Sequence, residues 1–242
     1  MVRLVAVGGV VLLLVLAALS PLWLRLGGGA VVPIALAVLH ALAMTGLAQW
    51  SLGDLRRDAF VPASPHPADY VTMTRSVIAS GCLALVVVAL ADDLTLPSWW
   101  LAGVAFPALV LDAVDGPVAR RTGTASPAGG RYDMEADSVF VLILALGATM
   151  IYGPWVMVIG AMRYAFVLAA VLVPRLRRPL AFNPVRRVIA AIQATVLVVS
   201  VSPLLPYGVN VILLVLVLAS LLYSFGRDVI TLLRDPAPQP AT

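Results

Sequence analysis

The stretch LDAVDGPVARRTGTASPAGGRYDMEAD, from Leu111 to Asp137, is a polar interruption in a chain that is otherwise strongly apolar. It holds five of the twelve acidic residues of the protein, including the only glutamate, Glu135. Apolar runs lie on both sides of it, so the stretch predicts a short connection between two consecutive helices. Helices joined in this way pack antiparallel, which places their polar ends at the same side of the molecule.

The composition indicates an integral membrane protein. The chain has 242 residues, of which 62% are hydrophobic and 12% are charged, and its mean hydropathy is +1.03. A water-soluble protein of this composition would have to expose a large apolar surface to water, which is energetically unfavourable. The net charge of +4 does not indicate nucleic-acid binding, because the arginines punctuate apolar runs and form no single basic face. The single cysteine, Cys82, excludes an intrachain disulfide and a thiolate metal site.

Eight apolar runs have about the 20 residues that a helix needs to cross the hydrocarbon core of a bilayer. They cover residues 4–24, 30–50, 74–91, 97–114, 136–152, 154–174, 188–204 and 208–226. We therefore predict an all-α integral membrane protein with eight transmembrane helices. The first run, with Arg3 at its start, is also compatible with a signal peptide cleaved near Ala17 to Ser20, although a second span follows it directly.

The polar, proline-containing segment at 51–67 predicts a linker. The predicted organisation is an N-terminal transmembrane hairpin, a cytoplasmic linker, a six-helix body and a cytoplasmic tail, at residues 1–50, 51–67, 68–227 and 228–242.

The arginines predict the orientation in the membrane. They gather in every second connection, at residues 56–75, 120–131, 175–187 and 227–234, and Arg25 is the exception. By the positive-inside rule these connections and both termini are cytoplasmic. The absence of lysine suggests a GC-rich bacterial genome, so we predict a multi-pass protein of the cytoplasmic (inner) membrane whose acidic stretch faces the cytoplasm.

Two carboxylates share one helix face before the connection. At about 100° per residue, Asp112, Asp115, Gly116 and Ala119 occupy one stripe of the fourth predicted helix. Two acidic side chains thus lie beside two of the smallest residues.

A second acidic stripe follows the connection. Asp133 and Asp137 are four residues apart on the next helix, whereas Glu135 points away from them. The antiparallel arrangement aims both stripes at one cavity.

The four aspartates predict a divalent metal site. Carboxylates crowded at a membrane boundary are costly to leave ionised without cations. No histidine or cysteine accompanies them, and an all-oxygen site suits Mg²⁺ or Mn²⁺. Such ions also bind a diphosphate and stabilise its leaving oxygen. The alternative is a salt-bridged loop in which Arg120, Arg121 and Arg131 pair with the aspartates.

The full spacing is D-x2-D-G-x2-A-R-x8-G-x3-D-x3-D. It is met by Asp112, Asp115, Gly116, Ala119, Arg120, Gly129, Asp133 and Asp137. This pattern resembles the signature of the CDP-alcohol phosphotransferase family, and the resemblance covers about residues 69–227. It implies the six-helix body of that family, with the N-terminal hairpin outside it.

The resemblance also implies a reaction. Family members transfer a phosphoalcohol from a CDP-linked donor, usually CDP-diacylglycerol in bacteria, to an acceptor hydroxyl and release CMP. It implies two divalent ions, Mg²⁺ or Mn²⁺, held by Asp112, Asp115, Asp133 and Asp137. Asp137 is also implied as the base that takes the proton of the attacking hydroxyl. A homodimer in the lipid bilayer is implied as well.

The nucleotide contacts are implied by the same resemblance. Gly116 and Ala119 give the cytidine nucleotide room against the helix, Arg120 orients it, and Asp112 is also placed beside it. Family members often carry N-x-x-T-x-x-R before the first body helix. Asp69, Thr72 and Arg75 stand in those places, with Asp where the family has Asn, and Thr72 and Arg75 are assigned to the nucleotide.

A phosphorylated acceptor needs a cationic pocket of its own. Arg163 is the first candidate, because an arginine within a span is expensive unless it faces a cavity or a partner. Its alternative role is to pair with a carboxylate of the acidic stripe. Arg186, Arg187 and Arg131 are predicted to complete the pocket, although interfacial arginines also serve topology and lipid headgroups.

Two other readings of the sequence remain. Within the same chemistry, the alternative is a soluble CDP-alcohol as the donor and a lipid alcohol as the acceptor. From a different class, intramembrane aspartates can form the path of a divalent-cation transporter. The position of the aspartates near one end of their helices favours the phosphotransferase, which acts on a small alcohol.

Overall fold

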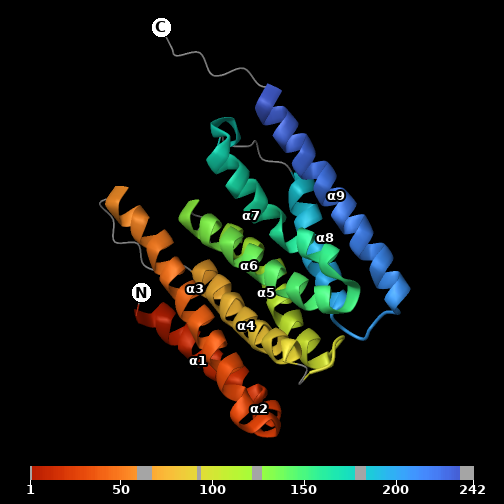
Figure 1. Cartoon of the computed structure of the whole chain (residues 1–242). Helices are drawn as coiled ribbons and strands as arrows, with labels where there is room; N and C mark the ends of the chain where they lie inside the picture. The colour runs from red at the N-terminus through yellow and green to blue at the C-terminus, as the bar shows by residue number, and fades with distance from the viewer. Residues whose placement is uncertain (1, 59–66, 92–93, 122–126, 178–183, 235–242) are drawn as a thin grey trace.

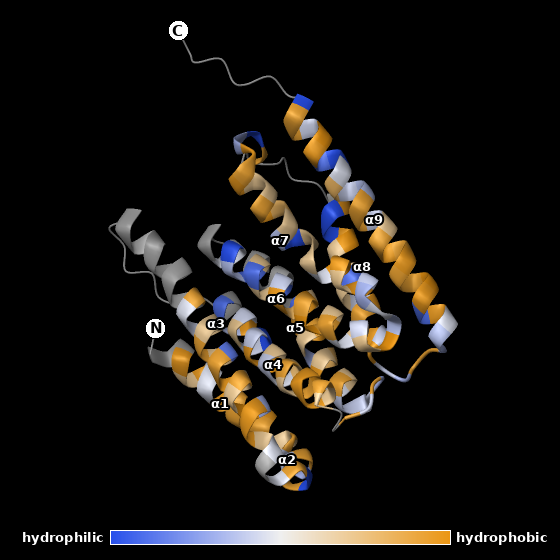
Figure 2. Ribbon diagram, in the orientation of Figure 1, coloured by the Kyte–Doolittle hydropathy of each residue, from blue (hydrophilic) through white to orange (hydrophobic). Residues whose placement is uncertain are grey.

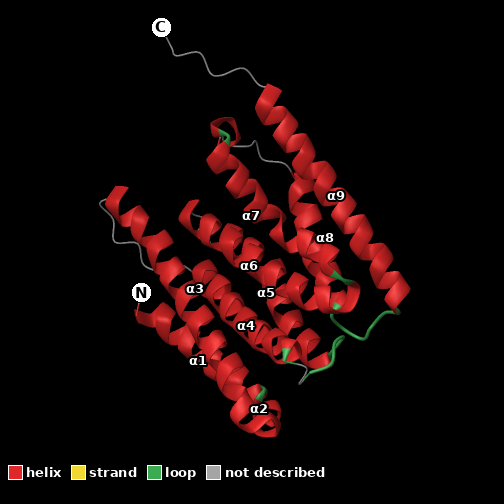
Figure 3. Ribbon diagram, in the orientation of Figure 1, coloured by secondary structure: helices red, strands yellow, loops and turns green. Residues whose placement is uncertain are grey.

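A computed structural model of the chain describes the backbone at residues 2–58, 67–91, 94–121, 127–177 and 184–234. Side chains are described in the same ranges except at 2–4, 28, 48–58, 67–68, 114–121, 127–128, 177 and 184. Every regular element in these ranges is a helix, and Figure 3 shows no strand in the described part of the chain. The all-α prediction is therefore confirmed.

Each predicted apolar run is mostly helical, although the run at 188–204 ends in a turn after Ser200. In chain order the elements are α1 (Val2–Ala18), α2 (Ser20–Leu26), η1 (Gly27–Ala30), α3 (Val31–Asp58), α4 (Pro67–Leu90), α5 (Trp99–Arg121), α6 (Pro127–Tyr152), η2 (Pro154–Val156), α7 (Met157–Leu172), η3 (Pro174–Arg177), α8 (Pro184–Ser200) and α9 (Tyr207–Arg234). Proline opens α4, α6 and α8, where its missing N–H costs no hydrogen bond. The first eight residues of the predicted linker belong to α3, and α9 extends into the predicted tail.

The membrane-spanning part is less regular than eight straight helices. Four helices in the described ranges are long and apolar enough to cross a membrane: Asp69–Leu90, Gly129–Tyr152, Pro154–Leu172 and Tyr207–Arg234. The first predicted run breaks between α1 and α2, which are bent by 60° and give a fifth candidate only as a pair. A Gly-Pro break also separates α6 from α7, since Gly153 has a φ of +96°. The number of eight spans stays a prediction.

Helix α4 is the centre of the molecule. It packs against α1, α3, α5 and α6, and Figure 1 shows it between the N-terminal helices and the rest of the bundle. Of the residues in its apolar window 78% are buried, against 17% for the α7 span and 22% for α9. In Figure 2 the outer helix α9 is apolar along most of its length, whereas hydrophilic residues of α6 gather near its N-terminal end.

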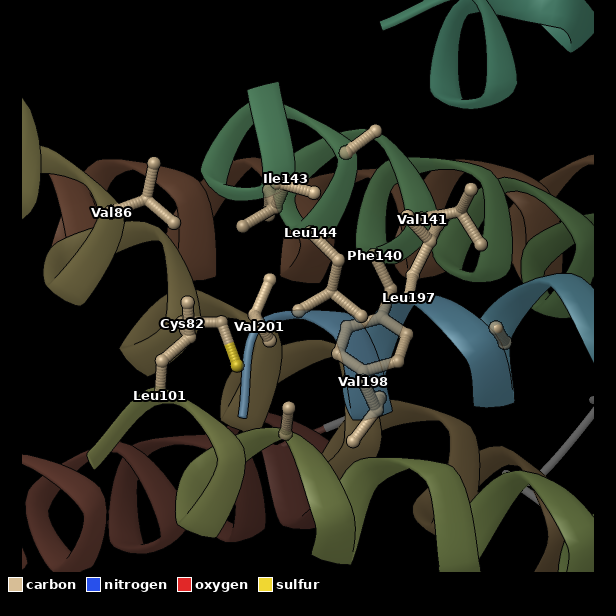
Figure 4. Close-up of a cluster of buried hydrophobic side chains, with 14 of the residues drawn as sticks. Cys82, Val86, Leu101, Phe140, Val141, Ile143, Leu144, Leu197, Val198 and Val201 are labelled. Atoms are coloured by element: carbon tan, nitrogen blue, oxygen red, sulfur yellow. The ribbon is translucent and has the colours of Figure 1, made fainter. Parts of the chain in front are cut away.

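The main core joins α4, α5, α6 and α8. Cys82, Leu101, Leu144 and Leu197 are completely buried there, and Figure 4 shows their side chains converging from these helices. Cys82 is thus a small apolar core residue, as its sequence context predicts.

Close packing fixes α4 against its neighbours. A Cβ atom on Gly81 would lie 2.5 Å from Val15 Cγ1 and 3.1 Å from Val104 Cγ1. Only a residue without a side chain lets α1 and α5 approach α4 at this level.

Polar contacts also join the N-terminal helices to α4. His40 of α3 has its Nδ1 atom 2.8 Å from the hydroxyl oxygen of Ser80. A smaller cluster of buried residues lies nearby and contains Ala41, Met73, Val77 and Tyr132. Helices α1 and α3 therefore cover part of the surface of α4.

Candidate metal and nucleotide site

Three carboxylates meet where the C-terminal part of α5 passes the N-terminal part of α6. Asp112, Asp133 and Asp137 each offer one oxygen atom, and these three atoms all lie within 4.8 Å of one another. We call these residues the aspartate triad. Their side chains are 31%, 36% and 45% exposed. The triad is thus accessible from outside the protein while its helices remain packed.

The helical spacing explains the convergence. Asp133 and Asp137 are four residues apart, so they point from the same face of α6. Asp112 faces them from α5, which continues as helix through Arg121. The two predicted acidic faces therefore meet, although the helices α5 and α6 are each longer than the apolar runs that predicted them.

Arg75 of α4 lies against the triad. Its guanidinium forms ion pairs with Asp112 and Asp133, and its Nη2 atom is 2.8 Å from Asp137 Oδ1. The side chain is only 1% exposed. One buried cation thus joins carboxylates from two other helices, and three carboxylates against one guanidinium leave two negative charges in excess.

The triad suits a hard divalent cation. Its donors are all carboxylate oxygens, the ligand type that Mg²⁺ and Mn²⁺ prefer. Among the described side chains, the triad and Arg75 taken by themselves have an excess of formal negative charge, which favours a cation. The oxygen atoms are close enough to share an ion after small movements of exposed side chains. The described residues therefore fit a divalent metal.

Four predicted site residues have side chains outside the described set. These are Asp115, Gly116, Ala119 and Arg120. Their backbone belongs to α5, as the predicted helical stripe requires.

Hydrogen bonds also join α4 to α6 next to the aspartate triad. Tyr132 is completely buried, and its hydroxyl donates to Ser76 Oγ at 3.2 Å. Ser76 Oγ in turn donates to the carbonyl oxygen of Thr72 at 2.8 Å. Thr72 and Asp69 are themselves buried beside the site. Sequence reasoning missed Tyr132, because a tyrosine inside a polar stretch gives no signal of burial.

The four arginines predicted for an acceptor are dispersed over three helices. Arg163 of α7 is ion-paired with Glu135 of α6. Arg186 of α8 has its Nη1 atom 3.2 Å from Asp228 Oδ2 of α9. The other two, Arg187 and Arg131, are exposed. Arg163 thus contacts the one acidic residue of the stretch that the helical spacing had separated from the aspartates.

Comparison with known protein families agrees with this geometry. The model of the family described as CDP-alcohol phosphatidyltransferase matches residues 65–223, which include α4 to α8 and most of α9. Searches of curated proteins and of solved structures found no match to the chain. The matched segment contains the aspartate triad and Arg75 and covers well over half of the protein. The chain therefore belongs to the CDP-alcohol phosphatidyltransferase family, whose members are transferases of substituted phosphate groups.

Proposed function

We propose that the protein transfers a phosphatidyl group from CDP-diacylglycerol to the hydroxyl of a small alcohol and releases CMP. The observation that carries this proposal is the aspartate triad, whose oxygens lie within 4.8 Å of one another inside the family-matched segment. A lipid-linked donor suits this chain, because its acyl chains can remain in the bilayer while the headgroup reaches the triad. A soluble CDP-alcohol donor with a lipid acceptor is the alternative.

Two divalent ions, Mg²⁺ or Mn²⁺, complete the proposed site. Asp112, Asp115, Asp133 and Asp137 would hold them. When bound, such ions neutralise the diphosphate and stabilise the charge that develops on the departing oxygen. The chain has no need of a protein nucleophile for this transfer.

The nucleotide is proposed to lie along α5. Gly116 and Ala119 leave room for the cytidine, while Arg120 orients it and Asp112 lies beside it. Thr72 and Arg75 approach from α4. A guanidinium is well suited to this position, because its planar N–H groups match two phosphate oxygens at once.

Asp137 is the proposed general base. It is the most exposed member of the triad and is therefore the most accessible to an incoming hydroxyl. It takes the proton of the acceptor, the freed oxygen forms a bond to the β-phosphorus of the donor, and the bond from that phosphorus to CMP breaks. The electron pair leaves with CMP.

The acceptor is proposed to carry a phosphate. Arg163, Arg186, Arg187 and Arg131 supply the cations that such a group needs. Arg163 and Arg186 already have carboxylate partners, so the phosphate would share each guanidinium with an acidic side chain. A guanidinium that is paired with one carboxylate can still bind a phosphate group, which carries more negative charge.

The proposed setting is the bacterial cytoplasmic membrane. The Arg-bearing connections support a cytoplasmic position for the triad by the positive-inside rule, which would give it access to soluble acceptors. The family resemblance further supports a homodimer.

The decisive experiment measures CMP release by the purified full-length protein in detergent. CDP-diacylglycerol is supplied with Mn²⁺ or Mg²⁺ and with a panel of phosphorylated and unphosphorylated alcohols. Radiolabelled donors, lipid-linked and soluble, identify which part is transferred. We expect CMP release that requires metal, stops with EDTA and falls by about 100-fold or more in Asp137→Asn, as is typical when a group essential to the transition state is lost.

The matched control is Asp235→Asn, which makes the same chemical change outside the family-matched segment and should retain wild-type activity. Activity that persists in EDTA and in Asp137→Asn would refute the proposed chemistry.

A further inference from the structure

We propose that Arg75 is a built-in counter-ion of the aspartate triad, which gives up carboxylate oxygens when a divalent metal binds and then pairs with the diphosphate of the donor. Metal and nucleotide would consequently bind cooperatively. This inference rests on the proposed function, because it assigns the order in which the same site fills.

The contacts of Arg75 with the triad are the first observation that supports this inference. Its two terminal nitrogens reach the Oδ1 atoms of all three triad members. The triad members come from α5 and α6, whereas Arg75 comes from the central helix α4. The guanidinium therefore occupies the point towards which the carboxylates converge.

Electrostatics gives this contact a function before any metal arrives. The triad oxygens lie within 4.8 Å of one another, so the negative charges of the three carboxylates repel one another, and a neighbouring positive charge offsets that repulsion. Arg75 supplies that charge from a position that is only 1% exposed. The guanidinium thereby reduces the repulsion that would otherwise spread the three carboxylates apart before a metal binds.

The same contact opposes the metal. A divalent ion that binds the triad competes with Arg75 for the same three carboxylates, whose Oδ1 atoms already pair with the guanidinium. It also comes within a few ångströms of a fixed positive charge, and two cations so close repel strongly in a partly buried site. Arg75 should therefore weaken metal binding as long as it stays on the carboxylates.

A bound diphosphate would remove this competition between Arg75 and the metal for the triad. Its oxygens offer the guanidinium another bidentate partner while they also ligate the metal. Binding of the nucleotide thus releases the oxygens for the metal, and by linkage the metal strengthens binding of the nucleotide by the same factor. The arginine would keep the site from holding metal tightly in the absence of donor.

Equilibrium Mn²⁺ binding tests the inference without any turnover. Free Mn²⁺ is followed by electron paramagnetic resonance during titration of the full-length protein in detergent. We expect Arg75→Gln to bind Mn²⁺ at least about tenfold more tightly than wild type, because one nearby positive charge is removed. Arg75→Lys keeps the charge and should stay close to wild type. Arg175→Gln removes an exposed arginine of η3 and should leave the affinity unchanged.

A second titration adds CDP, with the formation of Mn–CDP complex measured separately without protein. CDP should tighten Mn²⁺ binding to wild type more than to Arg75→Gln. An Arg75→Gln protein that elutes and melts as a folded species, yet binds Mn²⁺ no more tightly than wild type, overturns the inference. If that variant does not fold, wild-type protein whose Mn²⁺ affinity is unaffected by CDP overturns it equally.

The two proposals fail separately. Wild type that releases CMP with metal, combined with no gain of affinity in Arg75→Gln, removes only the role of Arg75 as counter-ion. Wild type that releases no CMP from any CDP-linked donor at saturating metal removes the proposed function, whatever the binding data show.

Discussion

Arg75 and Arg163 are both arginines in apolar helices, but they neutralise different amounts of charge. Arg75 is buried and meets three carboxylates from two neighbouring helices. Arg163 is 27% exposed and is ion-paired with one, Glu135. Arg75 and the triad together have an excess of negative charge and can take up a cation, whereas the opposite charges of Arg163 and Glu135 balance each other. The comparison shows that the surplus of carboxylates, rather than an arginine in an apolar helix, distinguishes the candidate metal site.

The strongest test of this comparison changes acids two residues apart on α6. We expect Asp133→Asn to lose metal binding and to reduce CMP release by about 100-fold or more, because it removes a charge that stabilises the transition state through the metal. Glu135→Gln is the matched variant and should bind Mn²⁺ like wild type. Titration with Mn²⁺ and the CMP assay measure both effects. Equal loss of metal binding in the two variants would mean that the triad and the Glu135–Arg163 pair form one site.

A second test asks whether the balanced pair serves the acceptor. If Arg163 binds a phosphate, Arg163→Gln should raise the KM for a phosphorylated acceptor by about tenfold, with a smaller effect on an unphosphorylated one. Glu135→Gln should act in the opposite direction and lower that KM, because it frees the guanidinium. Steady-state kinetics with both acceptor types gives the answer. A KM that rises in both variants would indicate that the pair only holds α6 against α7.

The smallest effect is expected at Tyr132, which is hydrogen-bonded to Ser76, the neighbour of Arg75 in the chain. Tyr132→Phe removes the hydroxyl that donates to Ser76 and should lower stability by about 0.6 kcal/mol, a typical value for a hydrogen bond between membrane helices. Because Tyr132 immediately precedes Asp133, we also expect about a twofold loss of Mn²⁺ affinity. Thermal melting in detergent and the Mn²⁺ titration measure the two quantities. Ser220→Ala, which removes a hydroxyl bonded within α9, is the control and should leave Mn²⁺ affinity unchanged.

The convergence of the triad was predictable because it depends on local rules. Asp133 and Asp137 share a helix face by their spacing, and the short connection brings Asp112 against them. The same rules separated Glu135 from the triad. The structure confirms that these three aspartates meet.

The contacts of the arginines were not predictable in the same way. Arg75 is 37 residues from Asp112 and 58 from Asp133 along the chain, and no periodic pattern relates positions so far apart on different helices. The resemblance assigned Arg75 to the nucleotide, which remains a proposal. The sequence had suggested a carboxylate of the acidic stripe as a partner of Arg163, whereas the structure pairs Arg163 with Glu135, which lies outside that stripe. Such pairings depend on how whole helices rotate and tilt against one another, which the packing of their apolar faces decides.

The break between α1 and α2 could not be predicted from the sequence pattern either. The run at 4–24 is uniformly apolar, so hydropathy alone gives one straight span. The 60° bend between α1 and α2 depends on local backbone geometry, where the Ser20-Pro21 pair begins a new helix. Proline at the first turn is compatible with either outcome, since it starts helices and kinks them.

The central position of α4 has a practical consequence. The family match begins at residue 65, so a protein trimmed to the matched segment would lack α1, α2 and α3. That cut would strip the cover from Met73 and Tyr132 and leave the Ser80 hydroxyl facing lipid without His40. Helices α1 and α3 are therefore part of the protein's packed interior, and a minimal version of this transferase would have to retain them.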